Sequence, residues 1–235
     1  MGRNIIITGG LGYIGTELCK IYSGESWSNN IVVIDNRFIS ERVRQLNEWG
    51  IKFIYGDILD QHLVSKHLND ANIVHHLAGI TDVARVSKES HVEKDQKLNL
   101  IAIKGTNNVL SAMNSNAKII FPSTHVIYEG EKLLKKDILE KEIPSPILAY
   151  ASGKYENEKQ IKKSGKNFII FRLGSVYGYS NDSTRLNIMP NLFSRIASQN
   201  GTINLFSGGK QFKSLVPLID VARCFKLMSE NNKIK

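Results

Sequence analysis

The sequence of 235 residues is long enough for one α/β domain, or for one domain with a small appendage. Its composition, 42% hydrophobic and 23% charged, is ordinary for a globular protein, and no apolar run reaches the ~18 residues that a membrane-spanning helix needs. The N-terminus lacks the pattern of a signal peptide, because a strand-like apolar run leads directly into a glycine-rich turn. We therefore expect a cytoplasmic protein that does not bind a membrane.

The formal net charge of +9 raises the question of a nucleic-acid partner. Lysines and arginines are spread along the chain, and the densest cluster, at 159–166, lies beside Glu156 and Glu158 in a helical pattern. A nucleic-acid-binding surface would need clustered cations with interleaved aromatic side chains. We expect no nucleic-acid partner, a solvated helix face at this cluster, and a positive field that suits an anionic small molecule.

The cysteines and histidines predict neither a disulfide nor a metal site. Cys19 and Cys224 are far apart and form no metal-binding or redox motif, so we expect two reduced, buried thiols. Four histidines are candidate metal ligands, namely His75, His76, His91 and His125. None of them has a carboxylate or cysteine partner at the spacing of a metal site. We interpret His76 as a buried strand residue and expect no metal.

Strand and helix patterns alternate along the chain up to Gly178. Expected strands lie at 3–8, 30–35, 51–55, 72–76, 117–122 and 167–172, and expected helices at 12–21, 40–49, 61–68, 95–114 and 149–163. Continuous apolar strands separated by helices indicate a parallel sheet covered on both faces, so we predict a doubly wound α/β Rossmann fold. Beyond Gly178 the pattern weakens, and we expect a helix at 185–198, a short strand at 202–206 and a last helix at 217–229.

A glycine-rich turn, Thr8-Gly-Gly-Leu-Gly-Tyr-Ile-Gly15, joins the first expected strand to the first expected helix. Glycine allows the backbone to turn tightly and to approach a pyrophosphate without an intervening Cβ, and helix-terminal N–H groups then face the phosphate oxygens. Asp35, at the end of the second strand, is placed to accept both ribose hydroxyls of NAD and would repel the extra phosphate of NADP. Arg37 could reach that phosphate, but the carboxylate favours NAD over NADP as the cofactor.

A tyrosine and a lysine share one face of the expected helix at 149–163. Tyr150 and Lys154 are four residues apart, so both side chains can point into one cleft. A free tyrosine has a pKa near ~10, and a neighbouring ammonium favours the phenolate, which would bring Tyr150 closer to neutral pH. Thr124 follows the fifth strand at the carboxyl end of the sheet, where ligands bind in this architecture. Its hydroxyl could bond the reacting oxygen of a substrate or, alternatively, cap the turn that follows.

These motifs resemble the extended short-chain dehydrogenases/reductases, and within them the NAD-dependent epimerase/dehydratase family, such as UDP-glucose 4-epimerase. The similarity runs from the N-terminus to about residue 230. It rests on the glycine-rich turn, Asp35-Asn36, Gly56-Asp57-Ile58, His76-Leu77-Ala78-Gly79, Ser123-Thr124, Tyr150 with Lys154, and the stretch from Arg172 to Gly178.

The resemblance implies a role for each motif. Tyr13 and Ile14 would lie along the pyrophosphate, and Asp57 and Ile58 would contact the adenine. The implied catalytic residues are Thr124, Tyr150 as the acid/base, and Lys154. The implied cofactor-binding set is Gly9, Gly12, Tyr13, Ile14, Gly15, Asp35, Asn36, Asp57, Ile58, Leu77, Ala78, Gly79, Tyr150 and Lys154.

The sequence departs from the family pattern on the substrate side. Ser175 stands where the family has an asparagine after the sixth strand. Lys213 replaces an arginine that grips the substrate diphosphate, which keeps the charge but loses the two-pronged geometry of a guanidinium. The expected substrate-binding residues are Thr124, Ser175 and Lys213.

The family resemblance also implies a domain organisation. We expect an NAD-binding Rossmann domain at 1–178, a substrate-binding segment at 179–212 and a return to the last Rossmann helix at 213–235. Family members usually continue with a further strand and a substrate-enclosing segment, so the C-terminal substrate-binding part is expected to be small and truncated. Helices matching 95–114 and 149–163 commonly form a dimer interface in the family, which implies a homodimer.

The function implied by the resemblance is that of an NAD-dependent nucleotide-sugar epimerase, which acts on a nucleotide-diphosphate sugar through a transient keto-sugar intermediate. A nucleotide-sugar dehydratase is an alternative, although such relatives carry an acidic pair directly after the catalytic threonine, where this chain has His125 and Val126. An NAD(P)H-dependent reductase would share the same core motifs. A nucleotide-binding or sensing protein on an enzyme scaffold is the alternative from another class, against which the Tyr150–Lys154 pair argues.

Overall fold

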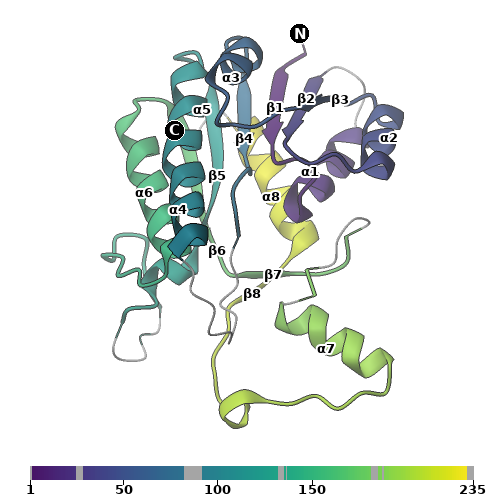
Figure 1. Ribbon diagram of the computed structural model, residues 1–235, viewed down its shortest axis with the longest axis vertical. Coiled ribbons are helices and arrows are strands. Elements are labelled where there is room, and N and C mark those ends of the chain that lie inside the picture. Colours follow the sequence, from purple (N-terminus) through teal and green to yellow (C-terminus); the bar gives the residue numbers. More distant parts are fainter. Residues whose placement is uncertain are drawn as a thin grey trace.

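The computed structural model describes residues 2–24, 29–81, 92–131, 135, 137–180, 185–186 and 188–231. Six parallel strands form one sheet in the order β3-β2-β1-β4-β5-β6 (Figure 1). They are β1 (Asn4–Thr8), β2 (Asn30–Asp35), β3 (Lys52–Tyr55), β4 (Ile73–His76), β5 (Lys118–Thr124) and β6 (Asn167–Leu173). The strand order reverses between β1 and β4, which is where a doubly wound sheet opens its ligand crevice. The predicted Rossmann fold is therefore confirmed.

Helices cover both faces of this sheet (Figure 1). One face carries α1 (Tyr13–Ser23), α2 (Ser40–Glu48) and α8 (Leu218–Glu230). The other carries α3 (Gln61–Leu68), α5 (Thr106–Ala112) and α6 (Ala149–Lys163), with α4 (Val92–Leu100) beside α6. On β1, Ile5 and Ile7 pack into the first hydrophobic cluster and Ile6 into the second. This alternation explains why the central strands are mostly apolar, since helices cover both of their faces.

The helix predicted at 95–114 is continuous but contains a π-helical turn, η1 (Ile101–Gly105), between α4 and α5. Two side chains of α6 bond to backbone carbonyls of this turn. Asn157 Nδ2 donates to the carbonyl of Ala102 at 2.7 Å, and Gln160 Nε2 donates to that of Ile103 at 3.0 Å. The π turn is thus stabilised from outside by the helix that carries the predicted catalytic pair.

The C-terminal part differs from the prediction in two places. The helix α7 (Met189–Ser198) starts later than residue 185, with Pro190 in its first turn, where its missing N–H costs nothing. The strand predicted at 202–206 is wrong, because residues 201–205 are exposed and pair with no described strand, and a 3-10 turn, η3 (Phe206–Gly209), follows. A parallel pair of β7 (Ser175–Tyr177) and β8 (Leu215–Pro217) was not predicted.

Neither Cys19 nor Cys224 is in a disulfide, and the two differ in burial. Cys19 is buried, whereas Cys224 is exposed, so the expectation of two buried thiols is wrong for Cys224. On α8, Val221 and Phe225 face the sheet, and Cys224 turns outward together with Arg223. Among the described residues, none of the helices has the length and hydropathy required to span a bilayer.

Candidate active site

A cleft of about 1820 Å³ runs along the carboxyl ends of the parallel strands. All residues predicted from the sequence for cofactor, catalysis or substrate line this cleft. They are Gly9, Gly12, Tyr13, Ile14, Gly15, Asp35, Asn36, Asp57, Ile58, Leu77, Ala78, Gly79, Thr124, Tyr150, Lys154, Ser175 and Lys213. The fold therefore brings the three predicted groups into one continuous space.

The glycine-rich turn forms one end of the cleft and leaves no room for larger residues. Gly9 has φ +71°, and a Cβ on it would lie 2.7 Å from the backbone nitrogen of Ala78. A Cβ on Gly15 would lie 2.5 Å from the carbonyl oxygen of Gly9. Helix α1 begins here without a side-chain cap and without an acidic residue in its first turn. Its first N–H groups are thus available to an anion, and the cradle fits a dinucleotide pyrophosphate.

Asp35 lines the cleft and is almost fully buried. Its Oδ2 accepts from the backbone N–H of Leu11 at 2.9 Å, and its Oδ1 accepts from that of Arg37 at 3.0 Å. The Arg37 guanidinium lies against both oxygens. Next to this pair, Asn36 Nδ2 donates to Asp57 Oδ2 at 2.9 Å. Two fixed carboxylates therefore border the position predicted for the ribose and adenine.

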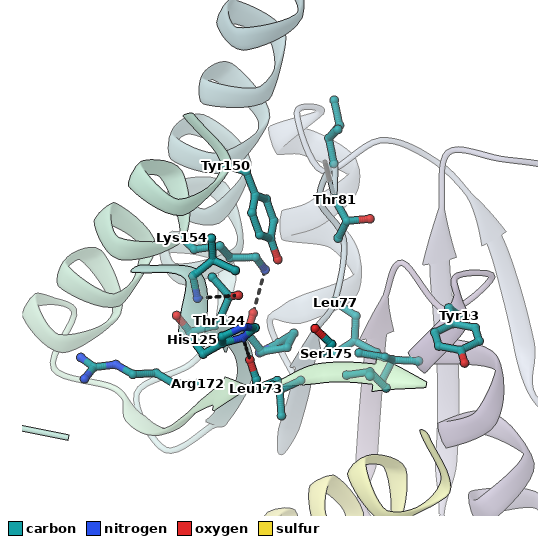
Figure 2. A pocket seen from close by; sticks show the side chains of 18 of the residues that line it. Tyr13, Leu77, Thr81, Thr124, His125, Tyr150, Lys154, Arg172, Leu173 and Ser175 are labelled. Carbon is teal, nitrogen blue, oxygen red and sulfur yellow. Dashed lines mark hydrogen bonds between the residues drawn. The ribbon is translucent and has the colours of Figure 1, made fainter. Parts of the chain in front are cut away.

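Tyr150 and Lys154 project from α6 toward Thr124, which ends β5 (Figure 2). Thr124 Oγ1 accepts from the backbone N–H of Val126 at 3.2 Å, so the predicted capping role is present. Because the oxygen accepts that bond, capping does not use the hydroxyl proton, which can be donated to the Tyr150 oxygen or to a substrate oxygen. Capping and substrate binding are thus compatible roles for one side chain.

Burial dominates the protonation of the Tyr150–Lys154 pair. It raises the pKa of Tyr150 above its usual value, while the charge of Arg185 and the Thr124 hydroxyl lower it in part. Burial also lowers the pKa of Lys154 to about 8. The Lys154 ammonium donates to the carbonyl of Pro122 at 2.7 Å. We expected Lys154 to lower the pKa of the Tyr150 phenol, and this lowering is not found.

Glu158 lies one helical turn beyond Lys154 and is fully buried. Its Oε1 accepts from Ser123 Oγ at 2.6 Å and from Arg172 Nε at 3.0 Å, and its Oε2 accepts from Arg172 Nη2 at 2.7 Å. The expectation of a solvated helix face is therefore wrong at this residue. Its spacing from Tyr150 and Lys154, i+8 and i+4, could have indicated that it shares their inward face.

His76 is buried between two threonines, which contact both of its ring nitrogens. Its Nδ1 lies 2.9 Å from Thr8 Oγ1, and its Nε2 lies 3.0 Å from Thr106 Oγ1. Burial lowers the pKa of His76 to about 3, which keeps the ring neutral. The described residues contain no group of three or more histidines, cysteines and carboxylates that could hold a metal, and His91 lies outside them.

The imidazole of His125 lines the cleft directly after Thr124. Its Nδ1 lies 2.9 Å from the carbonyl oxygen of Leu173, as Figure 2 shows. Since a carbonyl can only accept, Nδ1 carries a proton and donates it. This hydrogen bond ties the turn after β5 to the end of β6.

Two functional features of the C-terminal part have no motif in the sequence. Arg185 lines the cleft just before α7, and its charge lowers the pKa of Tyr150 in part. Tyr13 donates a hydrogen bond from its hydroxyl to the carbonyl of Gly178 and accepts one from Asn191 Nδ2 at 3.3 Å. The tyrosine predicted to lie along the pyrophosphate therefore also ties the glycine-rich turn to α7.

A family comparison agrees with this arrangement. The model of the NAD dependent epimerase/dehydratase family matches residues 5–235. This chain belongs to that family. The sequence-based resemblance is thereby confirmed, and the family's name specifies NAD-dependent enzymes.

Curated relatives include both reaction types of the family. A dTDP-D-glucose 4,6-dehydratase from Dictyostelium discoideum is 26% identical over 99% of this chain and 56% of its own length. A putative UDP-glucose 4-epimerase from Methanocaldococcus jannaschii is 27% identical over 97% of this chain and 74% of its own length. The chain thus spans about half to three quarters of the length of these relatives.

Solved structures of epimerases share the fold. The UDP-glucuronic acid 4-epimerase from Bacillus cereus, in complex with UDP-glucuronic acid and NAD, matches with a TM-score of 0.80 and 26% identity over 98% of this chain and 74% of that chain. The UDP-N-acetylglucosamine 4-epimerase from Methanobrevibacter ruminantium M1 matches in fold with a TM-score of 0.81 and 24% identity, over 98% of this chain and 74% of that chain.

Proposed function

We propose that this chain is a nucleotide-sugar epimerase that uses NAD and acts through a transient keto-sugar intermediate. One observation carries the proposal: a single cleft is lined by Tyr150, Lys154 and Thr124, by the glycine-rich turn, and by the cations Lys213 and Arg185. The epimerases among the relatives and structural neighbours support the same assignment.

Bound NAD would take a hydride from the reacting sugar carbon and return it, which no side chain of the chain can do. The chain's own residues would hold the dinucleotide at three points. Asp35 would accept hydrogen bonds from the adenosine ribose, and the first N–H groups of α1 would bond the pyrophosphate. Lys154, which already donates to the carbonyl of Pro122, would bond the second ribose. Its remaining ammonium protons are sufficient for this contact.

Tyr150 would act as the general base on the reacting hydroxyl and later as the acid. The raised pKa keeps the phenol of Tyr150 protonated, so a positive charge near the phenol oxygen is needed to favour the phenolate. The charge of Arg185, which lowers the pKa of Tyr150 in part, favours that ionisation. Thr124 would donate its hydroxyl proton to the same sugar oxygen. When the ketone is reduced from its second face, Tyr150 would return the proton to this oxygen.

The substrate proposed for this cleft is a nucleotide-diphosphate sugar. Lys213 and Arg185 bring two positive charges to the lining of the cleft, and the diphosphate of such a substrate requires counter-charge. Ser175, at the start of β7, would contribute a neutral hydroxyl to the sugar. The positive net charge of +9 would favour the approach of such an anion.

A dehydratase is the alternative that the Dictyostelium relative favours. Eliminating water requires an acid and a base beside the ketone, and the two residues after Thr124 are His125 and Val126. A carboxylate pair is therefore missing from this position, and the His125 Nδ1–H is already donated to the carbonyl of Leu173. A reductase and a nucleotide-sensing protein remain the alternatives from other reaction and protein classes.

The substitution Tyr150→Phe tests the proposal, with Tyr155→Phe on the same helix as the matched control. Turnover of UDP- and dTDP-hexoses, followed by NMR with NAD present, should fall about 10²- to 10⁴-fold in Tyr150→Phe. The affinity for NAD, measured by calorimetry, should stay unchanged in both variants. Unchanged turnover in Tyr150→Phe would contradict the proposed acid/base role.

We also propose that the protein forms a homodimer through the face of α4, η1 and α6, and that it works in the cytoplasm. Leu100 and Ile103 are 50% and 44% exposed on this face, which supports a covered surface. Cys19 and Cys224 are not in a disulfide, which supports a reducing compartment, and cell fractionation checks this location.

Sedimentation at micromolar concentration checks the dimer. The wild type should sediment as a dimer and the variant with Leu100→Glu and Ile103→Glu as a monomer, since buried carboxylates oppose association. Leu227→Glu, at an exposed leucine of α8, is the control and should leave the dimer intact. A monomeric wild type would contradict this proposal.

A further inference from the structure

A buried asparagine in the first turn of α7 joins three segments of the chain. Asn191 is 9% exposed. Its Oδ1 accepts from the backbone N–H of Gly178 at 2.9 Å, and its Nδ2 donates to the Tyr13 hydroxyl at 3.3 Å and to the carbonyl of Arg185 at 3.2 Å. Both donor positions of the amide are therefore used. A buried amide satisfied in this way favours one arrangement of the segments around it.

The turn that leads into α7 depends on this amide for its attachment. The carbonyl of Arg185 also accepts from the backbone N–H of Ile188 at 3.1 Å, which closes the turn on itself. Helix α7 begins without a side-chain cap at Ile188. In the described part of the chain, Asn191 is the one side chain that hydrogen-bonds to the backbone of Arg185 or Ile188. The amide therefore connects this turn to the glycine-rich turn through Tyr13.

The guanidinium of Arg185 acts on two tyrosines that line the cleft from different helices. Burial raises the pKa of Tyr13 at the start of α1, and the Asn191 amide and the charge of Arg185 lower it in part. Burial likewise raises the pKa of Tyr150 on α6, which the charge of Arg185 lowers in part. Arg185 itself lines the cleft. Its charge is thus within reach of both the glycine-rich turn and the proposed acid/base.

We infer that Asn191 is a positioning residue, which holds Arg185 where its guanidinium meets the diphosphate of the substrate. The inference rests on the proposed function, in which the substrate carries that diphosphate. Asn191 is not among the residues that line the cleft, so it acts through the backbone of Arg185. A long side chain that starts from a fixed backbone loses less conformational freedom when it binds an anion.

Calorimetric binding of UDP to the full chain, with NAD⁺ at saturation, tests the inference without turnover. Arg185→Met should weaken UDP binding by about 10-fold or more, as expected for losing a guanidinium–phosphate pair. Asn191→Ala should weaken it by about 3- to 10-fold, because Arg185 then lacks its fixed attachment. The double variant should stay within about 2-fold of Arg185→Met, since a residue that acts only through Arg185 has nothing left to position.

A milder variant and a matched control separate positioning from a loss of stability. Tyr13→Phe removes one partner of the amide and keeps the ring, and it should weaken UDP binding only where Arg185 is present. Asn114→Ala is the control, because Asn114 Nδ2 also donates to two carbonyls, of Asn69 at 3.4 Å and Ala71 at 2.7 Å, outside the cleft. It should leave UDP affinity unchanged. The affinity for NAD⁺ should stay within about 2-fold in Arg185→Met and Asn191→Ala, because backbone N–H groups hold the pyrophosphate.

The double variant decides the outcome. If the losses caused by Arg185→Met and Asn191→Ala multiply, or if Asn191→Ala leaves UDP affinity unchanged, the positioning role is refuted. If UDP binding follows the expected pattern but the wild type turns over no hexose, the positioning role stands and the epimerase function fails. If the wild type does not bind UDP, the nucleotide-sugar assignment fails and the inference with it.

Discussion

Desolvation has the largest effect on the pKa values of Tyr150 and Lys154, the proposed catalytic pair. Burial raises the pKa of Tyr150 and lowers that of Lys154 to about 8, so both shifts disfavour the charged form. The nearest compensation for Lys154 is the carbonyl of Pro122 at 2.7 Å and the face of the Phe121 ring, with its centroid 4.5 Å from Nζ. The cleft thus holds a partly desolvated cation that a ligand can stabilise.

This desolvation predicts a specific dependence of stability on pH. The pKa of Lys154 is about 8 in the folded protein against an ordinary value of 10.5, so its charge destabilises the fold in full below pH 8. The cost disappears as the pH rises to about 10.5. Relative to Lys154→Met, the free energy of unfolding of the wild type should therefore increase by about 1–3 kcal/mol between pH 8 and pH 10.5. Urea denaturation measures both proteins, and a constant difference across this range would refute the assignment.

At the level of elements, α6 is held in place by the buried carboxylate of Glu158. This residue connects α6 to Ser123 on β5 and to Arg172 on β6. Arg172 also donates from Nη1 to the Tyr128 hydroxyl and, at 2.8 Å, to the carbonyl of Glu140, which lines the cleft. One ion pair therefore sets the position of the catalytic helix relative to two strands and to a wall of the cleft.

Replacing Glu158 should disturb both stability and catalysis. Burial acts to raise the pKa of Glu158, but its hydrogen bonds with Arg172 and Ser123 and the charge of Arg172 lower it overall. Glu158→Gln leaves the mostly buried Arg172 without its counter-charge and should lower the free energy of unfolding by about 3 kcal/mol. Glu156→Gln, at an exposed glutamate of the same helix, should change it by less than about 0.5 kcal/mol. Equal effects in urea denaturation would show that Glu158 does not anchor α6.

The strands, the first helices and α6 could be predicted because their signals are local. Apolar runs, glycines after β1 and the four-residue spacing of Tyr150 and Lys154 are readable within a few residues. The β7–β8 pair could not be predicted, since each strand has three residues and its partner lies far along the chain. The place of Arg185 in the site could not be predicted for the same reason, because only the fold brings its charge near Tyr150.

At the scale of the whole molecule, a few long-range contacts join the dinucleotide cradle to the C-terminal part. Asn191 of α7 donates to the Tyr13 hydroxyl at 3.3 Å and accepts from the N–H of Gly178 at 2.9 Å. Tyr22 of α1 lies 3.0 Å from Ser229 of α8. The division of the chain into domains at residues 178 and 212 stays a prediction. These contacts connect α1 and the turn before it to Gly178, α7 and α8, and a reaction in a single cleft requires such fixed relative positions.

The most direct test of the account follows the hydrogen at the reacting carbon. A UDP- or dTDP-hexose deuterated at that carbon is incubated with the protein and a catalytic amount of NAD⁺, with NMR for the product and absorbance for NADH. The account predicts that the epimer forms with the deuterium retained at the same carbon and with no net NADH, because the hydride leaves and returns within one cleft. Deuterium at a neighbouring carbon, net accumulation of NADH, or no turnover of any hexose in the panel would contradict it.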